Sequence, residues 1–540
     1  MTPQEWITHD PDPVTAAELA GCDAAELAAR FARPLRFGTA GLRGPVRGGP
    51  DAMNTAVVLR ISWAVAQVLG RHRLSGSTVV VGRDARHGSE QFATAAADVF
   101  AAAGFSVLLL PAPLPTPVLA FAVRQLGAAA GVQITASHNP AADNGYKLYL
   151  DGGVQVVSPT DTEIEAAMAA APGADTIPRR AVQPAGGDLV QRYIGRAATI
   201  RRHRGRVRVA LTPLHGVGGA VAVAALMGAG FTDVHTVTSQ FDPDPDFPTV
   251  AFPNPEEPGA TDELLELAAG IVADVAIALD PDADRCAVAI PTPAGWRMLT
   301  GDETGWLLGD YLLAHPRGTR AADSVVASTV VSSRMLASIA EHYGARYVET
   351  LTGFKWLARA DVGLAGAILT YAYEEALGYC VDPDAVRDKD GISAAVLFCD
   401  LVAALRDRGS SVAAALDELA RRHGVHVGAA VSRRVADTAE AAAVMARLRA
   451  DPPSTLAGFT VTATDLLHRR EQATDALIFA GEHVDTAVRV VVRPSGTEPK
   501  LKCYIEVRRA PSADPSTDLA ADRTAATRLC DELAETVRGW

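Results

Sequence analysis

The chain has 540 residues, of which 48% are apolar and 21% charged. This balance is typical of a globular protein with several domains and excludes a disordered or collagen-like chain. The formal net charge of −13 excludes the broad positive field that nonspecific binding to nucleic acid or an anionic membrane requires, so we expect neither partner. A small phosphorylated ligand stays possible, because it needs only a local positive pocket.

The N-terminal segment from Met1 to Pro13 is polar and acidic, where a signal peptide would be basic and then apolar. The six cysteines form no C-x-x-C pair, which indicates free thiols in a reducing compartment. The uncharged run Val99 to Val123 is long enough to span a bilayer, but its four prolines exclude a continuous helix. We expect a buried strand over Ser106 to Leu110, followed by an extended proline loop, in a cytoplasmic protein.

Three apolar strands, each followed by a helical pattern, recur at intervals of about 120 residues. They are expected over Val79 to Gly82, Val207 to Leu211 and Val325 to Val331. A strand that feeds a helix is the repeating unit of a mostly parallel sheet with helices on both faces. The pattern therefore predicts an α/β protein with three similar domains in tandem.

A fourth, smaller α+β domain is expected at the C-terminus, with strands over Ala487 to Val492 and Leu501 to Val507 and a helix over Asp518 to Val537. Basic loops and a Pro-Pro pair between the repeats indicate where the domains meet. The predicted domains are 1–205, 206–320, 321–452 and 453–540.

The segment Asp280-Pro281-Asp282-Ala283-Asp284-Arg285 directly follows an apolar strand, Val275 to Leu279. Open α/β sheets bind ligands beyond the carboxyl ends of their strands, and three alternating carboxylates can converge on one Mg²⁺ or Ca²⁺. The segment is not an EF-hand, since Arg285 and Pro291 replace the required Gly and Glu. The alternative is a solvated acidic turn.

A second segment, Thr135-Ala136-Ser137-His138-Asn139-Pro140, also follows apolar residues. A serine beside a histidine suggests an activated nucleophile, although the chain contains neither G-x-S-x-G nor a Walker A motif. Taken alone, such a segment is more often a helix-capping turn. Lys147 comes shortly afterwards, and we expect an Asn-Gly turn at Asn144 to fold it back towards the serine.

A third segment, Arg493 to Lys500, places Arg, Ser, Gly and Thr around one tight turn, which suits a bound phosphate. A plain hairpin loop is the alternative. Weaker segments of the same kind are Gly38 to Gly44, Thr352 to Trp356 and Glu374 to Gly378. The only five lysines, in a chain that otherwise uses arginine, lie in or beside these segments; they are Lys147, Lys355, Lys389, Lys500 and Lys502.

Taken in chain order, these segments resemble the motifs of the α-D-phosphohexomutase superfamily, in its phosphoglucomutase and phosphopentomutase branch. The resemblance runs from about Arg36 to Lys502. It implies three α/β domains and a TATA-binding-protein-like fourth domain around a central cleft. It also implies a phosphoserine at Ser137 and a bound Mg²⁺, with the metal ligands Ser137, Asp280, Asp282 and Asp284.

The same resemblance implies roles for the remaining motif residues. Arg43 and Arg285 would assist the reacting phosphoryl group, and His138 and Lys147 are the acid/base candidates. The sugar phosphate would be bound by residues of the weaker segments and of the Arg493 turn, together with Lys389: Thr352, Gly353, Lys355, Glu374, Lys389, Arg493, Ser495, Gly496 and Thr497.

The implied reaction is reversible phosphoryl transfer between C1 and C6 of a hexose phosphate, through a sugar 1,6-bisphosphate. Many hexose mutases carry a hydroxyl residue where this chain has Ala376, so the mannose and pentose phosphates stay open as alternatives. Two other classes are weighed: a metal-dependent sugar phosphatase, which would not need the Arg493 turn, and a Ca²⁺-stabilised binding module, which the failed EF-hand pattern disfavours. A monomer and a dimer are both possible.

Overall fold

The computed structural model describes the whole chain except residues 39–40, 317, 470–472, 496–499 and 512–517. Short polar side chains cap the N-termini of several of its long helices. Asn54 caps α4 (Thr55–Arg71), and Asp518 caps α17 (Leu519–Arg538), each by accepting hydrogen bonds from first-turn N–H groups. These groups have no partner within the helix, so the cap sets where it starts. The C-terminal helix predicted from the sequence is confirmed.

The chain folds into two compact units, the first formed by Met1–Thr304 with Ala376–Asp407 and the second by Gly305–Glu375 with Arg408–Trp540. The helices of the first unit are α1 (Pro3–Thr8), α2 (Pro13–Gly21), α3 (Ala24–Ala32), α4, α5 (Ser89–Ala102), α6 (Thr116–Leu126), α7 (Thr160–Ala169), α8 (Gly187–Ala198), α9 (Gly219–Gly228), α10 (Asp262–Gly270) and α14 (Gly391–Asp407). Its strands are β1 (Leu42–Pro45), β2 (Thr78–Arg83), β3 (Ser106–Pro113), β4 (Ala130–Ile134), β5 (Asp143–Leu150), β6 (Val154–Gln155), β7 (Arg208–Thr212), β8 (Asp233–Thr236), β9 (Val275–Leu279), β10 (Cys286–Thr292), β11 (Gly295–Met298) and β15 (Gly378–Cys380).

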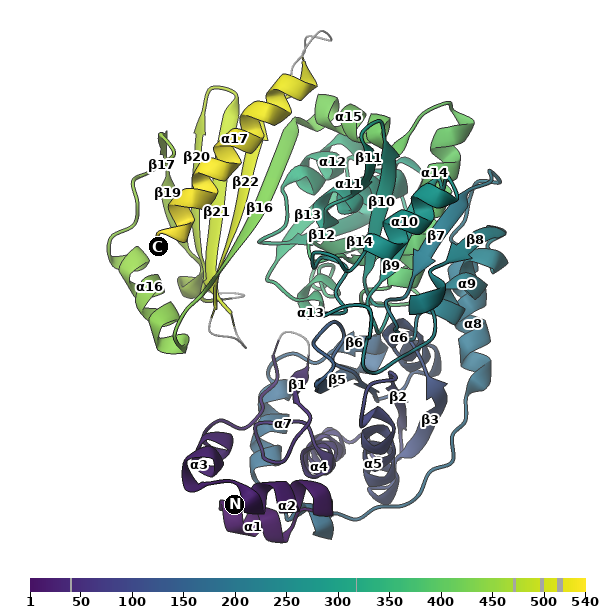
Figure 1. The fold of residues 1–540 in the computed structure, drawn as a ribbon, viewed down its shortest axis with the longest axis vertical. Coiled ribbons are helices and arrows are strands. Elements are labelled where there is room, and N and C mark those ends of the chain that lie inside the picture. Colours follow the sequence, from purple (N-terminus) through teal and green to yellow (C-terminus); the bar gives the residue numbers. More distant parts are fainter. Residues whose placement is uncertain (39–40, 317, 470–472, 496–499, 512–517) are drawn as a thin grey trace. The chain divides into compact units, whose positions relative to one another are not determined.

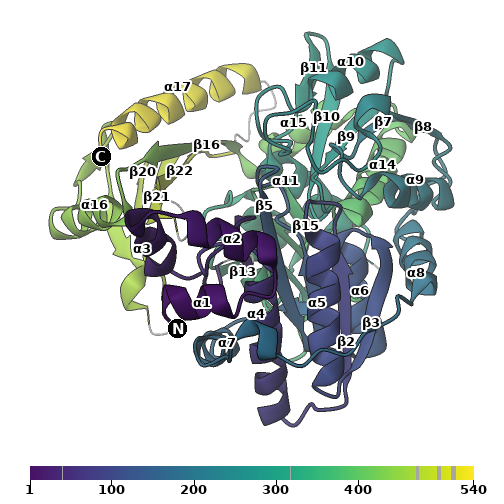
Figure 2. The same cartoon turned by 60° about the horizontal axis from the view of Figure 1, so that its bottom comes forward.

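The first sheet has the order β1-β5-β4-β2-β3, with β6 paired to β5 (Figure 1). Strand β2 is parallel to β3 and β4, whereas β1, β5 and β6 form antiparallel pairs. Alternate strand residues face opposite sides: Val79 and Val81 join the core with α4 and α5, and Gly82 faces α6. Figure 2 shows α5 running alongside β2 and β3. The carboxyl ends of β2 and β4 therefore meet at one edge.

The second sheet has the order β11-β10-β9-β7-β8, with β7 parallel to both β8 and β9. Helix α10 covers one face through alanine-rich contacts, and α14 contacts β9 and β10. All five residues of β9 are buried, as expected for a central strand covered on both faces. The predicted strand Val275 to Leu279 is confirmed.

Helix α11 (Gly301–Ala314) contains the point where the chain passes into the second unit. That unit has the helices α12 (Met335–Tyr343), α13 (Phe354–Leu357), α15 (Val412–His423), α16 (Thr438–Ala450) and α17. Its strands are β12 (Ser324–Thr329), β13 (Arg346–Thr350), β14 (Ile368–Glu374), β16 (Val425–Arg434), β17 (Thr455–Leu456), β18 (Phe459–Thr460), β19 (Thr462–Asp465), β20 (Leu477–His483), β21 (Thr486–Pro494) and β22 (Lys500–Arg509).

Within the second unit, β12 is parallel to β13 and β14. A separate antiparallel sheet has the order β16-β22-β21-β20-β19 and carries α16 and α17 on one face. Its other face packs Ile478 and Val491 against Val330 and Val331, which follow β12. The fold is thus α/β with a C-terminal α+β part, as predicted. None of the described helices combines the length and apolar character needed to cross a bilayer.

Two local predictions were wrong. The proline-rich segment is not an extended loop, because β3 continues through Pro113 and α6 begins at Thr116. Proline is tolerated there because β3 is an edge strand. Asn144 and Gly145 do not form a turn but lie within β5. A glycine is needed because a Cβ at position 145 would lie 2.5 Å from the Thr135 carbonyl oxygen on the neighbouring segment.

A buried carboxylate on β22 connects the C-terminal sheet to the start of α12. Glu506 Oε1 accepts hydrogen bonds from Ser333 Oγ (2.6 Å) and the Arg334 N–H (2.9 Å), and lies 2.8 Å from His426 Nδ1. Burial opposes ionisation, but His426 and these donors lower the pKa of Glu506 to about 2. The carboxylate therefore stabilises the fold above pH 4.5, its ordinary pKa, and this stabilisation is lost as the pH falls through about 2.

We expect Glu506→Gln to lower the free energy of unfolding at pH 7 by about 3 kcal/mol. The difference from the wild type should shrink as the pH falls below 4.5. Urea unfolding at a series of pH values measures this difference in the free energy of unfolding. The control is Glu482→Gln, because Glu482 lies on the same sheet but is exposed. A pH-independent difference would contradict this account.

Candidate active site

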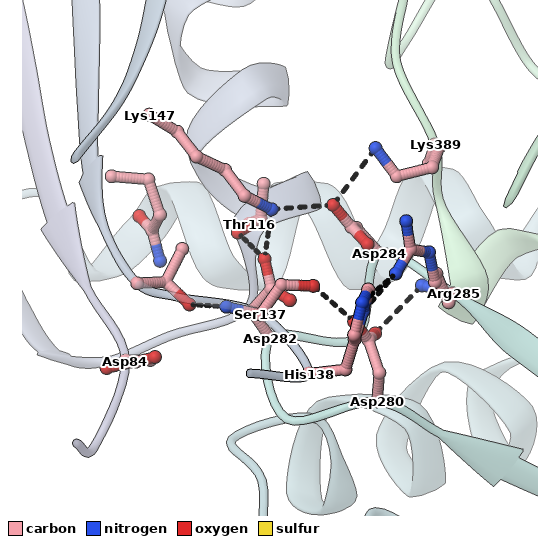
Figure 3. Close-up of polar contacts among 12 residues, drawn as sticks. Asp84, Thr116, Ser137, His138, Lys147, Asp280, Asp282, Asp284, Arg285 and Lys389 are labelled. Carbon is pink, nitrogen blue, oxygen red and sulfur yellow. Dashed lines mark hydrogen bonds and ion pairs between the residues drawn. The ribbon is translucent and has the colours of Figure 1, made fainter. Parts of the chain in front are cut away.

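The serine loop, residues 135–140, directly follows β4 at the carboxyl edge of the first sheet. Ser137 is only 1% exposed and has a φ of 55°, a conformation that non-glycine residues rarely adopt. Its N–H donates to Thr135 Oγ1 (2.9 Å), and its Oγ donates to Asp280 Oδ2 (2.6 Å). Backbone strain of this kind is concentrated at functional sites. The Ser137 hydroxyl contacts Asp280 and not the adjacent imidazole (Figure 3).

The aspartate loop, residues 280–285, follows β9 and is fully buried at all three carboxylates. One oxygen from each of Asp280, Asp282 and Asp284 lies within 4.8 Å of the others. The second oxygens, Asp282 Oδ1 and Asp284 Oδ1, are buried without a hydrogen-bond partner among the described residues. Three convergent carboxylates with two unsatisfied oxygens fit a hard divalent cation. The solvated acidic turn is excluded by this burial.

Two lysines neutralise part of the negative charge of the aspartate loop (Figure 3). Lys147 Nζ donates to Asp282 Oδ2 (2.5 Å) and Asp284 Oδ2 (2.7 Å), and Lys389 Nζ lies 3.2 Å from Asp284 Oδ2. Lys147 is brought here by β5, where it is paired with Gln133 of β4, and not by a turn. The Thr116 hydroxyl also donates to Asp282 Oδ2 (2.5 Å).

The three carboxyls differ in their electrostatic environment. Burial, together with the charges of Asp282 and Asp284, raises the pKa of Asp280 well above its usual value. Burial also opposes ionisation of Asp282, but the charge and hydrogen bond of Lys147 hold the pKa of that carboxyl below its usual value. The hydrogen bonds of Asp280 come from the Ser137 hydroxyl and the Arg285 N–H, whereas the lysines contact Asp282 and Asp284. Asp280 is thus the carboxyl that most needs a further cation.

His138 lies against the guanidinium of Arg285, with which its ring forms a hydrogen bond. Burial and the positive charges of Arg285 and Arg43 lower the pKa of His138 well below its usual value, so the imidazole is neutral. Arg43, on β1, donates from Nη1 to Asn139 Oδ1 (3.1 Å) in the serine loop. The structure therefore brings together all five residues predicted as catalytic: Arg43, Ser137, His138, Lys147 and Arg285.

The aspartate loop is fixed by close backbone contacts. Gly391, at the start of α14, donates its N–H to the Ala283 carbonyl oxygen, and a Cβ at this position would lie 2.4 Å from the Arg285 carbonyl oxygen. Only glycine allows this approach. It holds the segment that carries Lys389 beside the carboxylates. Asp388 further secures this segment by accepting hydrogen bonds from Tyr149 and Gln155.

Sequence reasoning missed several residues at this site, notably Asp84, Arg86 and Thr116. Arg86 donates hydrogen bonds to carbonyl groups of the serine loop, and Asp84 lies beside it. Both follow β2, so their place after an apolar strand could have revealed them by the reasoning used for Asp280. Thr116 has no such signal, because only the tertiary fold brings it to Asp282.

In the second unit, two of the predicted sugar-phosphate segments meet. Arg493, at the end of β21, donates from Nη1 to Thr352 Oγ1 (2.7 Å). Thr352 lies two residues before the start of α13. Gly353 has a φ of 103°, which a side chain would disfavour, and Lys355 lies half-buried in α13. Glu374 is buried at the end of β14, and the Ser495 N–H donates to the Lys500 carbonyl oxygen. Gly496 and Thr497 lie outside the described residues.

Models of the four domains of one family match the chain. The family is phosphoglucomutase/phosphomannomutase, with alpha/beta/alpha domain I over residues 34–173, domain II over 191–295, domain III over 300–423 and the C-terminal domain over 431–514.

Individual proteins are also similar over nearly the whole chain. A Haemophilus influenzae protein named "Probable phosphomannomutase" is 40% identical over 87% of this chain and 96% of its own length. A Schizosaccharomyces pombe protein named "Probable phosphoribomutase" is 35% identical over 93% of each chain. The solved open form of the phosphoglucomutase parafusin from Paramecium has the same fold, with a TM-score of 0.70 at 19% identity, over 93% of this chain and 95% of that one.

The fold, the convergent carboxylates and these matches define a phosphosugar mutase. The chain belongs to the phosphoglucomutase/phosphomannomutase family, as the order of its motifs predicted. It is an isomerase that transfers a phosphoryl group within a sugar phosphate.

Proposed function

We propose that this enzyme interconverts glucose 1-phosphate and glucose 6-phosphate through a phosphoserine at Ser137. The observation that carries the proposal is the 2.6 Å hydrogen bond from Ser137 Oγ to Asp280 within a buried carboxylate triad. This contact places the candidate phosphoryl carrier beside the groups that can hold a divalent cation. A phosphoryl group on Ser137 would need such neutralisation, because it would carry its charge into a buried acidic site.

Asp280, Asp282 and Asp284 would hold Mg²⁺ together with an oxygen of phosphoserine 137. The ion would neutralise charge on the transferring phosphoryl group. Arg285 and Arg43 provide fixed positive charge beside the serine loop, and Lys147 provides an ammonium within reach of the same carboxylates. His138 or Lys147, the two acid/base candidates, would accept the proton that the attacking sugar hydroxyl loses, and a proton would be returned to Ser137 Oγ as its bond to phosphorus breaks.

The sugar would be bound by groups of the second unit. We assign Glu374 to the sugar hydroxyls and the turn with Arg493, Ser495, Gly496 and Thr497 to the phosphate that is not reacting. Thr352, Gly353 and Lys355 would contact the ring, and Lys389, which belongs to the first unit, would lie near the ligand. A separate phosphate site is needed because a sugar 1,6-bisphosphate intermediate must turn over and present its other phosphate to Ser137.

Incubation with glucose 1-phosphate, Mg²⁺ and a trace of glucose 1,6-bisphosphate tests the proposal. Isomerisation to glucose 6-phosphate supports a mutase, whereas release of inorganic phosphate would indicate the phosphatase. A catalytically silent protein would contradict both. The same preparation should behave as a monomer or dimer in light scattering and should not bind nucleic acid or vesicles. A cytoplasmic location, consistent with six free thiols, completes the proposal.

A second candidate substrate is ribose 1-phosphate. It is favoured by the Schizosaccharomyces pombe relative's name and by Ala376, which offers no hydroxyl to a hexose ring. Loss of one neutral hydrogen bond costs only about 0.5–1.5 kcal/mol, whereas the phosphate contacts are charge-assisted and stronger. We therefore expect relaxed specificity, with glucose 1-phosphate preferred and pentose and mannose phosphates accepted.

Ala376→Ser should sharpen the preference for a hexose by about three- to tenfold, the equivalent of one hydrogen bond. The measurement is kcat/KM for glucose, mannose and ribose 1-phosphates on both proteins. A wild-type preference above about 10⁴ would contradict relaxed specificity, because one absent hydroxyl cannot account for so large a ratio. The ring would then be recognised by other groups, first among them residues 353–356.

A further inference from the structure

A buried arginine, Arg86, lies beneath the serine loop and donates hydrogen bonds to four main-chain carbonyl groups, three in the loop and one at Asp143, the first residue of β5. Nη2 donates to the carbonyl oxygens of Ser137 and Asn139, both at 2.6 Å. Nη1 donates to those of Pro140 (2.7 Å) and Asp143 (3.1 Å). Arg86 is 4% exposed, so these bonds do not compete with bulk water. One guanidinium thus fixes the main chain from the candidate phosphoryl carrier to the start of β5.

Arg86 is itself held in one orientation. Its N–H donates to Asp84 Oδ1 (2.9 Å), and the Asp84 carboxylate lies 3.4 Å from Nε. Asp84 is fixed in turn by the Ser89 hydroxyl (2.6 Å). The guanidinium faces the ring of Phe247, 4.9 Å from its centroid. A planar group held by a carboxylate and an aromatic face is a rigid platform for the loop.

The serine loop needs such a platform because its backbone is strained. Ser137 has a φ of 55°, and strained residues persist only where their surroundings hold them. Four carbonyl oxygens directed at one point would repel one another without a cation between them. Loss of the guanidinium should therefore let the loop relax and move the Ser137 hydroxyl. A displacement of 1 Å is enough to reduce a rate by about 100-fold.

We propose that Arg86 is a positioning residue, which holds Ser137 in its reactive conformation without contacting the substrate. This inference rests on the proposed function, since it assumes that Ser137 carries the phosphoryl group. It predicts a loss of turnover that is separate from any loss of stability.

The chain offers a matched control in Arg60. This arginine is 6% exposed, donates to the carbonyl oxygens of Met168, Ala171 and Pro172, and faces the ring of Trp6 at 5.4 Å. It joins α4 to the segment at the end of α7, and none of its acceptors belongs to the serine loop. Arg60→Met and Arg86→Met therefore remove the same kind of buried group, but only one of them supports Ser137.

The test compares wild type, Arg86→Met, Arg86→Lys and Arg60→Met. For Arg86→Met we expect kcat per folded enzyme to fall by about 100-fold while KM changes by less than about threefold. Arg60→Met should lower the melting temperature to a similar extent and keep kcat. Arg86→Lys should recover part of the activity, because an ammonium keeps the charge but cannot span four acceptors.

A second readout does not depend on activity. Amide hydrogen exchange of residues 135–143 should become faster in both Arg86 variants and stay unchanged in Arg60→Met. Equal kcat in Arg86→Met and Arg60→Met, or unchanged exchange in the serine loop, would overturn the proposal. If Arg86→Met does not fold, Arg86→Lys decides the same two points. A wild type that neither isomerises the sugar phosphate nor takes phosphate at Ser137 would instead refute the proposed function.

Discussion

Replacing Ser137 by glycine or by alanine should reduce mutase turnover by at least about 10³-fold while sugar-phosphate binding is retained, because either change removes the proposed phosphoryl carrier. The two variants differ in a useful way. The φ of 55° at this position is strained for alanine but easy for glycine, so Ser137→Gly should fold at least as stably as Ser137→Ala. Inactivity of both variants would then reflect lost chemistry and not lost structure.

The measurements are kcat, the dissociation constant for glucose 1-phosphate, and incorporation of labelled phosphate from glucose 1,6-bisphosphate. Ser62→Ala is the matched control. Ser62 is also buried, and its replacement removes one hydrogen bond, to the Tyr146 hydroxyl, outside the site. It should keep both turnover and labelling. A Ser137 variant with more than about a tenth of the wild-type kcat would show that phosphate is carried elsewhere.

Removal of divalent cations should abolish activity, and Mg²⁺ should restore it. The physical reason is that three buried carboxylates each place an oxygen within 4.8 Å of the others. Two further oxygens of this set, Asp282 Oδ1 and Asp284 Oδ1, have no hydrogen-bond partner among the described residues. Lys147 and Lys389 neutralise only part of this charge. A cation is the remaining way to offset the cost of burying it.

Calorimetric titration with Mg²⁺ provides a readout that does not depend on turnover. Asp282→Asn should weaken Mg²⁺ binding by at least about 10- to 100-fold. A loss of that size is usual even when the mutated residue only hydrogen-bonds to a metal ligand, and Asp282 is proposed to be a ligand itself. Asp400→Asn is the control, because Asp400 is equally buried but accepts hydrogen bonds from the Arg202 and His203 N–H groups instead. Full activity after exhaustive chelation, or unchanged binding in Asp282→Asn, would assign the triad another role.

Much of this site could be predicted from the sequence because its parts are local. Asp280, Asp282 and Asp284 alternate after an apolar strand, and both the strand and the convergence of the carboxylates follow from that spacing. Ser137 likewise follows a buried strand. Strand burial and the alternation of side chains can be recognised from neighbouring residues alone, without knowledge of the rest of the chain.

Contacts between distant segments were decided by the tertiary structure alone. Thr116 and Lys147 both reach Asp282, and Arg86 reaches the serine loop, across separations that no local pattern records. The sequence also misled at Gly145, whose small size serves close strand packing and not a turn. The residue types and their spacing thus determined which chemistry the chain carries. Only the packing of β2, β4, β5 and β9 decided which charges meet, because an ion pair depends on distance in space and not along the chain.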